Sequence, residues 1–245
     1  MLLWLLACGG ATLEQASEAA PEAAACVGEG TDAALASCLR PTLAPDYYVD
    51  QALMYFDTLD VDADRSRVPA YHPQVARWEW PPWLLLTGYG ADAMVETADA
   101  LRLIDPSTVP ERDCRFFEEQ PFARCYIVFE YEGGLCPIYE EFVFNDAGEM
   151  TFIEAWSDLP GLLPHPDPAG DPWGERSDLG RLSTRVPGLG QPSGTISLEG
   201  DAMNAAAATD PDLAEFQRRA LDPWGTWFAE LAGADDDFFD QGCGW

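Results

Sequence analysis

Two adjacent carboxylates, Glu140 and Glu141, are the residues whose type and spacing most directly suggest chemistry. They lie in the stretch CPIYEEFVFNDAGEMTFIEAW, residues 136–156, which predicts two strands around a tight turn at 145–148. Neighbouring strand residues point to opposite faces, so one glutamate is expected to face solvent and the other the covered side of a sheet. A carboxyl group buried in a pocket is a candidate functional group.

Neither metal nor cofactor chemistry is expected. Asp60, Asp62 and Asp64 follow the first positions of a calcium loop, but Arg65 replaces the required glycine and Tyr71 the final glutamate. We therefore expect a solvated acidic turn there. The sequence has no C-x-x-C motif, its two histidines are isolated, and TGYGADA follows no βαβ pattern, so neither a metal site nor a dinucleotide cofactor is predicted.

The composition suits one large domain, alone or with an ordered extension. The chain has 245 residues, of which 47% are hydrophobic, enough for a substantial core. All 13 basic residues are arginine, which excludes lysine Schiff-base chemistry and a lysine-dependent P-loop. The formal net charge of −30 predicts repulsion from nucleic acid and from anionic lipid headgroups.

The N-terminus predicts export. MLLWLLACGG is a short apolar run that ends like a bacterial lipobox, in which cleavage before Cys8 leaves a lipid-bearing cysteine. The run is shorter than a usual signal and has no basic residue before it, which a start codon assigned too late would explain. Residues 9–25 have the small and acidic composition of a tether. We expect a lipid-anchored envelope protein at the outer membrane or cell surface, or a secreted one.

Six further cysteines allow three disulfides, as an oxidising compartment favours. DCRFFEEQPFARCYIVFEY predicts a hairpin with its tip at residues 118–121, which places Cys114 directly opposite Cys125, close enough to bridge. Six cysteines allow 15 connectivities. We expect the one that joins Cys26 with Cys38 and Cys136 with Cys243, in addition to Cys114 with Cys125.

The remaining elements predict an α+β fold. Apolar stripes predict helices at residues 46–60 and 91–105, and residues 112–157 alternate as a meander of long antiparallel strands. Helices followed by strands indicate a curved sheet wrapped around the helices. Residues 159–200 are rich in proline and glycine, and their apolar side chains indicate a docked segment. Asp210-Pro211 and Asp222-Pro223 predict the starts of two short C-terminal helices.

Two segments carry a resemblance to a known family. YHPQVARWEWPPWLLLTGYGADAMVETADAL and IVFEYEGGLCPIYEEFVFNDAGEMTFIEAWSD resemble the nuclear-transport-factor-2-like superfamily, which includes SnoaL-like polyketide cyclases, ketosteroid isomerases and many binding domains. The resemblance covers residues 46–158 and implies a cone-shaped sheet around an apolar pocket. The fold hosts many activities, so it specifies function poorly.

The resemblance also implies which side chains line the pocket. If Phe144 opposes Glu149 in the hairpin, Phe142 pairs with Thr151 and Glu140 with Ile153. The row that faces the pocket in the isomerases then corresponds to Glu140, Phe142, Ile153 and Ala155, and Glu141 points outward.

The isomerase site is only partly matched. Tyr55 falls near the oxyanion-hole tyrosine, Glu140 on the protonated acid, and Trp80 on the general base. Glu79 is one residue away from that position and is therefore expected on the opposite face. A tryptophan in place of the base favours a pocket that binds without reacting, with Trp80 in its wall.

These observations predict four regions: a signal at residues 1–8, a tether with a small disulfide loop at 9–45, the cone domain at 46–158, and an extension at 159–245 that covers the sheet or the pocket. The expected function is non-catalytic binding of a small apolar molecule or an envelope protein. The alternatives are a lyase or isomerase that acts on a small hydrophobic, polyketide- or steroid-like substrate with Glu140 as acid and Tyr55 as polarising group, and a structural module whose own side chains fill the pocket.

Overall fold

The computed structural model describes residues 40–80, 87–132, 134–157, 170–171, 173–174 and 180–231. The expectations for Cys8, for the tether, for the Cys26–Cys38 pair and for Cys243 lie outside these residues. No helix among the described residues is both long and apolar enough to cross a bilayer.

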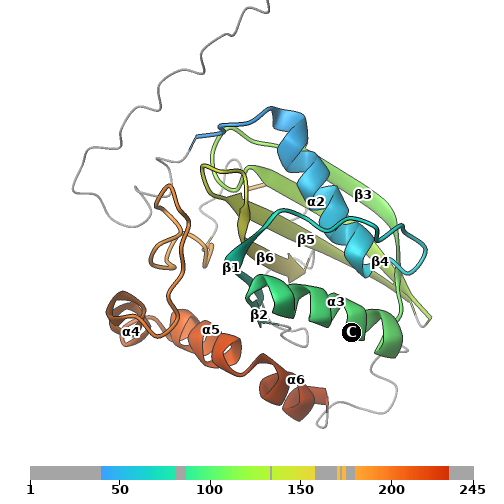
Figure 1. Ribbon diagram of the computed structural model, residues 1–245. Helices are drawn as coiled ribbons and strands as arrows, with labels where there is room; N and C mark the ends of the chain where they lie inside the picture. The colour runs from blue at the N-terminus through green and yellow to red at the C-terminus, as the bar shows by residue number, and fades with distance from the viewer. Residues whose placement is uncertain are drawn as a thin grey trace, which may run out of the picture.

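The described part of the chain folds as an α+β protein around a curved six-stranded sheet (Figure 1). The strands are β1 (Tyr71–Glu79), β2 (Gly88–Tyr89), β3 (Thr108–Phe116), β4 (Ala123–Tyr131), β5 (Gly134–Phe144) and β6 (Met150–Ser157). Their order across the sheet is β2-β1-β6-β5-β4-β3. All pairings are antiparallel except that of β1 with β6, which is parallel; the antiparallel meander predicted for residues 112–157 is confirmed in β3 to β6.

Helices cover this sheet on both faces. The described helices are α2 (Pro45–Leu59), α3 (Ala91–Ile104), α4 (Asp201–Ala207), α5 (Pro211–Leu221) and α6 (Pro223–Leu231). The two N-terminal helices match the apolar stripes in the sequence, and α3 ends just before Asp105-Pro106, where proline disfavours further helix. Asp210 caps α5 by accepting hydrogen bonds from the backbone N–H groups of Asp212 and Leu213.

The two faces of the sheet bury separate hydrophobic cores. We call the face that α2 and α3 cross the inner face (Figure 1); its core includes Tyr55 and Phe56 of α2 and Phe142 of β5. The opposite, outer face packs against the extension, and its core joins Trp78 and Phe152 of the sheet to extension residues. The extension residues in this core are Leu182, Val186, Leu189, Ile196, Leu198, Met203, Leu213, Phe216 and Ala220.

The hairpin between β3 and β4 has the predicted register. Cys114 lies opposite Cys125, and the two form a disulfide with Cα atoms 4.0 Å apart. Cys136 is also disulfide-bonded. Its predicted partner Cys243 lies outside the described residues, so this pairing stays a prediction.

The hairpin between β5 and β6 differs from its predicted register. Phe144 pairs with Met150, and a bulge then shifts the partners, so that Phe142 pairs with Ile153 and Glu140 with Ala155. The turn is one residue wider than expected because the Asn145 side chain organises it, accepting hydrogen bonds from the backbone N–H groups of residues 147 and 149. The wider turn and the bulge add one residue each, and a total shift of two leaves every side chain on its predicted face.

The extension meets this bulge closely. Gly194 adopts a φ of +60°, and a Cβ atom at this position would lie 2.6 Å from Cγ2 of Thr151 in the bulge. Both the left-handed backbone and the close approach require glycine. The extension is therefore fitted to the irregular part of the sheet.

Candidate functional site

The inner face holds a buried polar cluster centred on Glu140 of β5. Its Oε1 atom accepts a hydrogen bond from the Tyr55 hydroxyl of α2 at 3.1 Å and lies 3.2 Å from Nη2 of Arg77 in β1. Nε of Arg77 donates to the Tyr55 oxygen at 2.7 Å and to Glu140 Oε1 at 3.3 Å. Three elements far apart in sequence thus place a carboxyl, a guanidinium and a phenol in contact.

The other oxygen of Glu140 has no partner. Oε2 is fully buried and makes no hydrogen bond, while the whole residue is 0% exposed. Burial disfavours the charged carboxylate and raises the pKa of Glu140 to about 7, an effect that Glu79 reinforces and that Arg77 and Tyr55 oppose. The group can therefore exist in either protonation state near neutral pH.

Glu79 also belongs to this inner-face cluster. The prediction that it lies on the face of the sheet opposite to the pocket residues is wrong. Its Oε1 atom is 2.5 Å from Nη2 of Arg77. Strand β1 sets Arg77 opposite Ile153 and Glu79 opposite Ala155, so the two charged residues share the inner row. Trp80 accordingly points to the outer face.

Phenol groups surround the cluster. Burial raises the pKa values of Tyr55, Tyr71 and Tyr131, and Asp105 and Glu79 add to the effect on Tyr131. These phenols are therefore neutral and can donate their protons in hydrogen bonds. Asp105, just after α3, has its pKa raised to about 7 by partial burial.

Three of the four predicted pocket residues lie beside Glu140. Phe142, Ile153 and Ala155 are fully buried on the inner face, and the Phe142 ring is 5.3 Å from that of Tyr55. The fourth, Trp80, is in the outer-face core, where its indole N–H donates to Glu154 at 2.7 Å. Trp80 therefore does not line the same side of the sheet as Glu140.

Sequence reasoning missed Arg77 and Glu79 as site residues. The signal was present, since VARWEWP alternates charged residues with tryptophan. Alternation fixes which residues share a face, but it does not say which face carries the cluster when both faces are covered. Trp80 was expected in the pocket wall, although it packs in the core with the extension instead.

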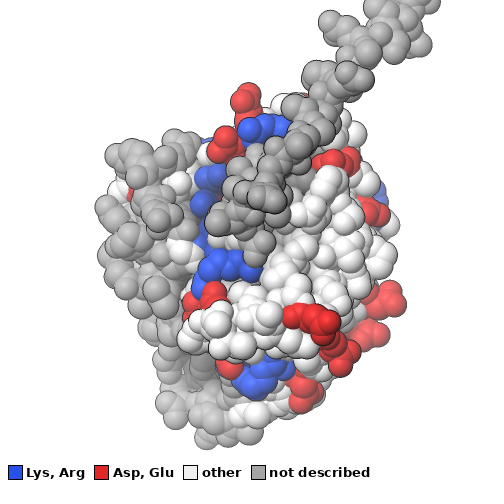
Figure 2. All heavy atoms as spheres, turned by 90° about the vertical axis from the view of Figure 1, so that its left-hand side faces the viewer, with Lys and Arg blue, Asp and Glu red and all other residues white. Residues whose placement is uncertain are grey.

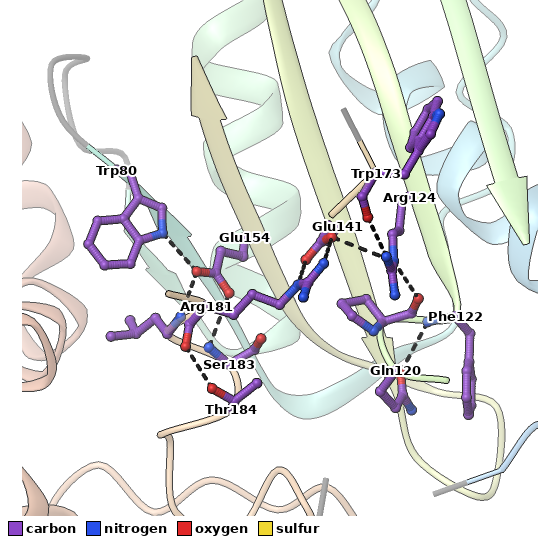
Figure 3. A network of polar contacts seen from close by, with 12 residues as sticks. Trp80, Gln120, Phe122, Arg124, Glu141, Glu154, Trp173, Arg181, Ser183 and Thr184 are labelled. Atoms are coloured by element: carbon purple, nitrogen blue, oxygen red, sulfur yellow. Dashed lines mark hydrogen bonds and ion pairs between the residues drawn. The ribbon is translucent and has the colours of Figure 1, made fainter. Parts of the chain in front are cut away.

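On the outer face, Glu141 binds two arginines (Figure 3). Its Oε1 atom accepts a hydrogen bond from Nη2 of Arg181 at 2.7 Å and lies 3.5 Å from Nε of Arg124. Arg124 also donates to the backbone carbonyl of Trp173. Glu141 was expected to face solvent, but it is only 2% exposed because the extension covers it.

Glu154 lies directly across from Glu141 on β6 and also holds the extension (Figure 3). Besides the Trp80 indole, its carboxylate accepts hydrogen bonds from the backbone N–H groups of Leu182 at 2.6 Å and Ser183 at 3.0 Å. Burial raises the pKa of Glu154, while these hydrogen bonds oppose the rise. We refer to Glu141, Glu154, Arg124 and Arg181 as the outer clasp.

Basic side chains gather on the face of the molecule seen in Figure 2, where arginines form a column with acidic groups beside several of them. Described arginines of the extension are ion-paired, as in the contact of 2.5 Å between Arg185 and Asp210. We therefore infer that the described arginines of the extension stabilise the fold.

No group of His, Cys, Asp or Glu within the described ranges is arranged to hold a metal ion. Two of the three aspartates that resemble a calcium loop are otherwise engaged. Asp60 pairs with Arg112 at 2.6 Å and accepts from the backbone N–H of Asp62, and Asp64 accepts from the backbone N–H of Ser66.

The fold and the cluster define an α+β protein with a buried acid, phenol and guanidinium on the helix-covered face of its sheet. Neither a protein-family profile nor a curated protein sequence matches the chain. Among solved structures, the chain is similar to a protein of unknown function with a cystatin-like fold from Methylobium petroleophilum PM1. The two share 16% sequence identity with a TM-score of 0.41, over 58% of this chain and 98% of that chain.

Proposed function

We propose that the protein binds a small, largely apolar ligand at the inner face, with Glu140 as the polar anchor, and does not transform it. The observation that carries this proposal is the half-satisfied Glu140 carboxyl group. All its hydrogen-bond donors converge on Oε1, and the equally buried Oε2 has none. An unpaired buried acceptor costs about 1–3 kcal/mol, which a ligand that completes it would recover.

Two features favour binding over catalysis. The position that matches the general base is Trp80, which lies in the outer-face core. The inner-face carboxylate of Glu79 is engaged by Arg77 at 2.5 Å. Arg77 also contacts Glu140 and holds the Glu140 side chain in place, which suits this carboxyl group to ligand recognition.

A second candidate function is that of a lyase or isomerase. It is favoured by the 3.1 Å contact between Tyr55 and Glu140 and by the pKa of about 7 for Glu140, because a general acid works best when its pKa lies near the working pH. In this alternative Glu140 donates a proton and Tyr55 polarises the substrate.

The family and the location are part of the proposal. Residues 46–158 resemble the nuclear-transport-factor-2-like superfamily, and the order of helices and sheet supports this assignment. The Cys114–Cys125 disulfide supports an oxidising compartment. The lipobox-like sequence that ends at Cys8 is the basis for proposing export into a bacterial envelope with a lipid on this cysteine. Its partner would be the apolar ligand or an envelope protein.

Native mass spectrometry of protein purified from its own host tests the proposal. We expect a bound small molecule on the wild type, loss of that mass in Glu140→Gln, and retention in Glu130→Gln, a matched change at an exposed glutamate of β4. A wild type that carries no ligand, or a Glu140→Gln variant that keeps it, would contradict the binding function. A substrate converted by the wild type but not by Glu140→Gln would favour the enzyme.

The same spectra report on Cys8. We expect an added lipid mass on the mature N-terminal cysteine and its loss in Cys8→Ser, which should also move from the membrane fraction to the soluble fraction. An unmodified mature chain would rule out the lipid anchor without affecting the ligand proposal.

A further inference from the structure

We propose, building on the binding function above, that the ligand carries a cationic amine and places it against Oε2 of Glu140. The ligand class is then an aliphatic amine with an apolar body. The argument uses the hydrogen-bond arrangement, the charge balance and the aromatic surroundings of the cluster.

The hydrogen-bond arrangement asks for a donor. Tyr55 and Arg77 both direct their hydrogens to Oε1, at 3.1 Å and 3.3 Å, so Oε2 is the open acceptor of the carboxylate. An ammonium group has three donors and no acceptor, and charge-assisted hydrogen bonds are about twice as strong as neutral ones.

The charge balance points the same way. Arg77 contacts both Glu79, at 2.5 Å, and Glu140, at 3.2 Å, so one guanidinium serves two carboxylates and lies closer to Glu79. A second cation at Oε2 would neutralise the charge of Glu140, the carboxylate that lies farther from Arg77. A carboxylate ligand at this position would meet like charge instead.

Aromatic rings provide the apolar surroundings. The ring of Tyr55 lies 5.1 Å from that of Phe56 and 5.3 Å from that of Phe142, and all three residues are buried in the inner-face core. Such rings can pack an alkyl chain, and their faces attract a desolvated ammonium group.

The pH dependence separates an amine from a carbonyl ligand. A protonated amine binds the ionised form of Glu140, so the carboxyl group releases its proton and binding of the amine tightens as pH rises towards 8. A carbonyl ligand needs the protonated form of Glu140, so its binding weakens over the same range. The other titratable or charged groups that act on this cluster are Tyr55 of α2, Tyr71, Arg77 and Glu79 of β1, Tyr131 of β4, and Asp105 after α3.

Octylamine, octanol and octanoate form a matched set of probes that differ only in the head group. By calorimetry on the full chain at pH 8 we expect octylamine to bind about tenfold or more tightly than octanol, and octanoate to bind most weakly. In Glu140→Gln this preference should fall to about twofold or less, whereas Glu130→Gln should keep it. Both variants remove one negative charge, so attraction to the acidic surface changes equally.

Three results would overturn the inference. The first is tightest binding of octanol or octanoate, and the second is an amine preference that survives in Glu140→Gln, which would assign it to the protein surface. Either leaves the binding function standing. The third is the absence of binding by all three probes, in which case the host-purified protein decides the binding function independently.

Discussion

Glu140 and Glu141 are adjacent in β5, and both are buried, on opposite faces of the same sheet. Each contacts an arginine from a distant part of the chain, Arg77 for Glu140 and Arg181 for Glu141. One strand therefore carries the candidate ligand site on its inner face and the outer clasp on its other face. The two roles can be separated by mutation because the side chains do not share a face.

Replacing Arg181 tests the outer clasp. Arg181→Met removes the hydrogen bond of 2.7 Å to Glu141, whose side chain is 2% exposed. We expect the free energy of unfolding to fall by about 2–3 kcal/mol, because Arg124 still compensates part of the buried charge of Glu141. Hydrogen exchange of residues 182–189 should also accelerate. Arg218→Met, which breaks an exposed pair on the same extension, should cost about 0.5 kcal/mol or less. Equal effects of both variants would count against a clasp.

The raised pKa of Glu140 predicts a pH-dependent stability. The folded protein holds this proton up to about pH 7, against an ordinary value of 4.5, so the stability it confers is complete below about pH 4.5 and is lost as pH rises through 7. The loss amounts to about 3 kcal/mol as an upper estimate. In chemical denaturation, Glu140→Gln should lose correspondingly less stability than the wild type between pH 4.5 and 7.5. Parallel curves for the two proteins would refute the shift.

Removing the Tyr55 hydroxyl tests the inner-face cluster. Tyr55→Phe deletes an acceptor for Arg77 at 2.7 Å and a donor to Glu140 at 3.1 Å, so we expect a loss of about 1–3 kcal/mol. The titration midpoint of Glu140, followed by carbon-13 NMR of its carboxyl group, should rise because the Tyr55 hydrogen bond lowers that pKa.

Tyr47→Phe is the matched control for this change. The Tyr47 hydroxyl donates to the Gly148 carbonyl at 3.0 Å in a partly exposed position, so its loss should cost about 1 kcal/mol or less and leave the Glu140 midpoint unchanged. A midpoint that falls in Tyr55→Phe would show that the hydroxyl does not stabilise the carboxylate.

The Cys114–Cys125 disulfide should stabilise the edge of the sheet. It closes a loop with a sequence separation of 11, so the double variant Cys114→Ala/Cys125→Ala is expected to lose about 2–3 kcal/mol of unfolding free energy. The variant is preferable to a reductant because Cys136 is also disulfide-bonded. Unfolding in denaturant under oxidising conditions measures the difference, and unchanged stability would contradict it.

The register of the second hairpin shows why sequence can assign faces better than partners. A predicted pairing of Glu140 with Ile153 became Glu140 with Ala155, because a wider turn and a bulge each added one residue. Side chains alternate with a period of two, so the inner-face positions of Phe142, Ile153 and Ala155 were unaffected. Bulges depend on local packing, here against Gly194 of the extension, and leave no reliable signal in a single strand.

The sequence by itself determined the α+β class, the two N-terminal helices and the Cys114–Cys125 pairing, because each depends on local periodicity or on the register of one hairpin. The family resemblance singled out Tyr55 and Glu140, and the tertiary structure showed that they are in contact. Only the tertiary structure decided that Arg77 and Glu79 complete the inner-face cluster, that Trp80 lies outside it, and that Glu141 is buried. Strand alternation says which side chains share a face, but what covers that face depends on segments that are remote in sequence.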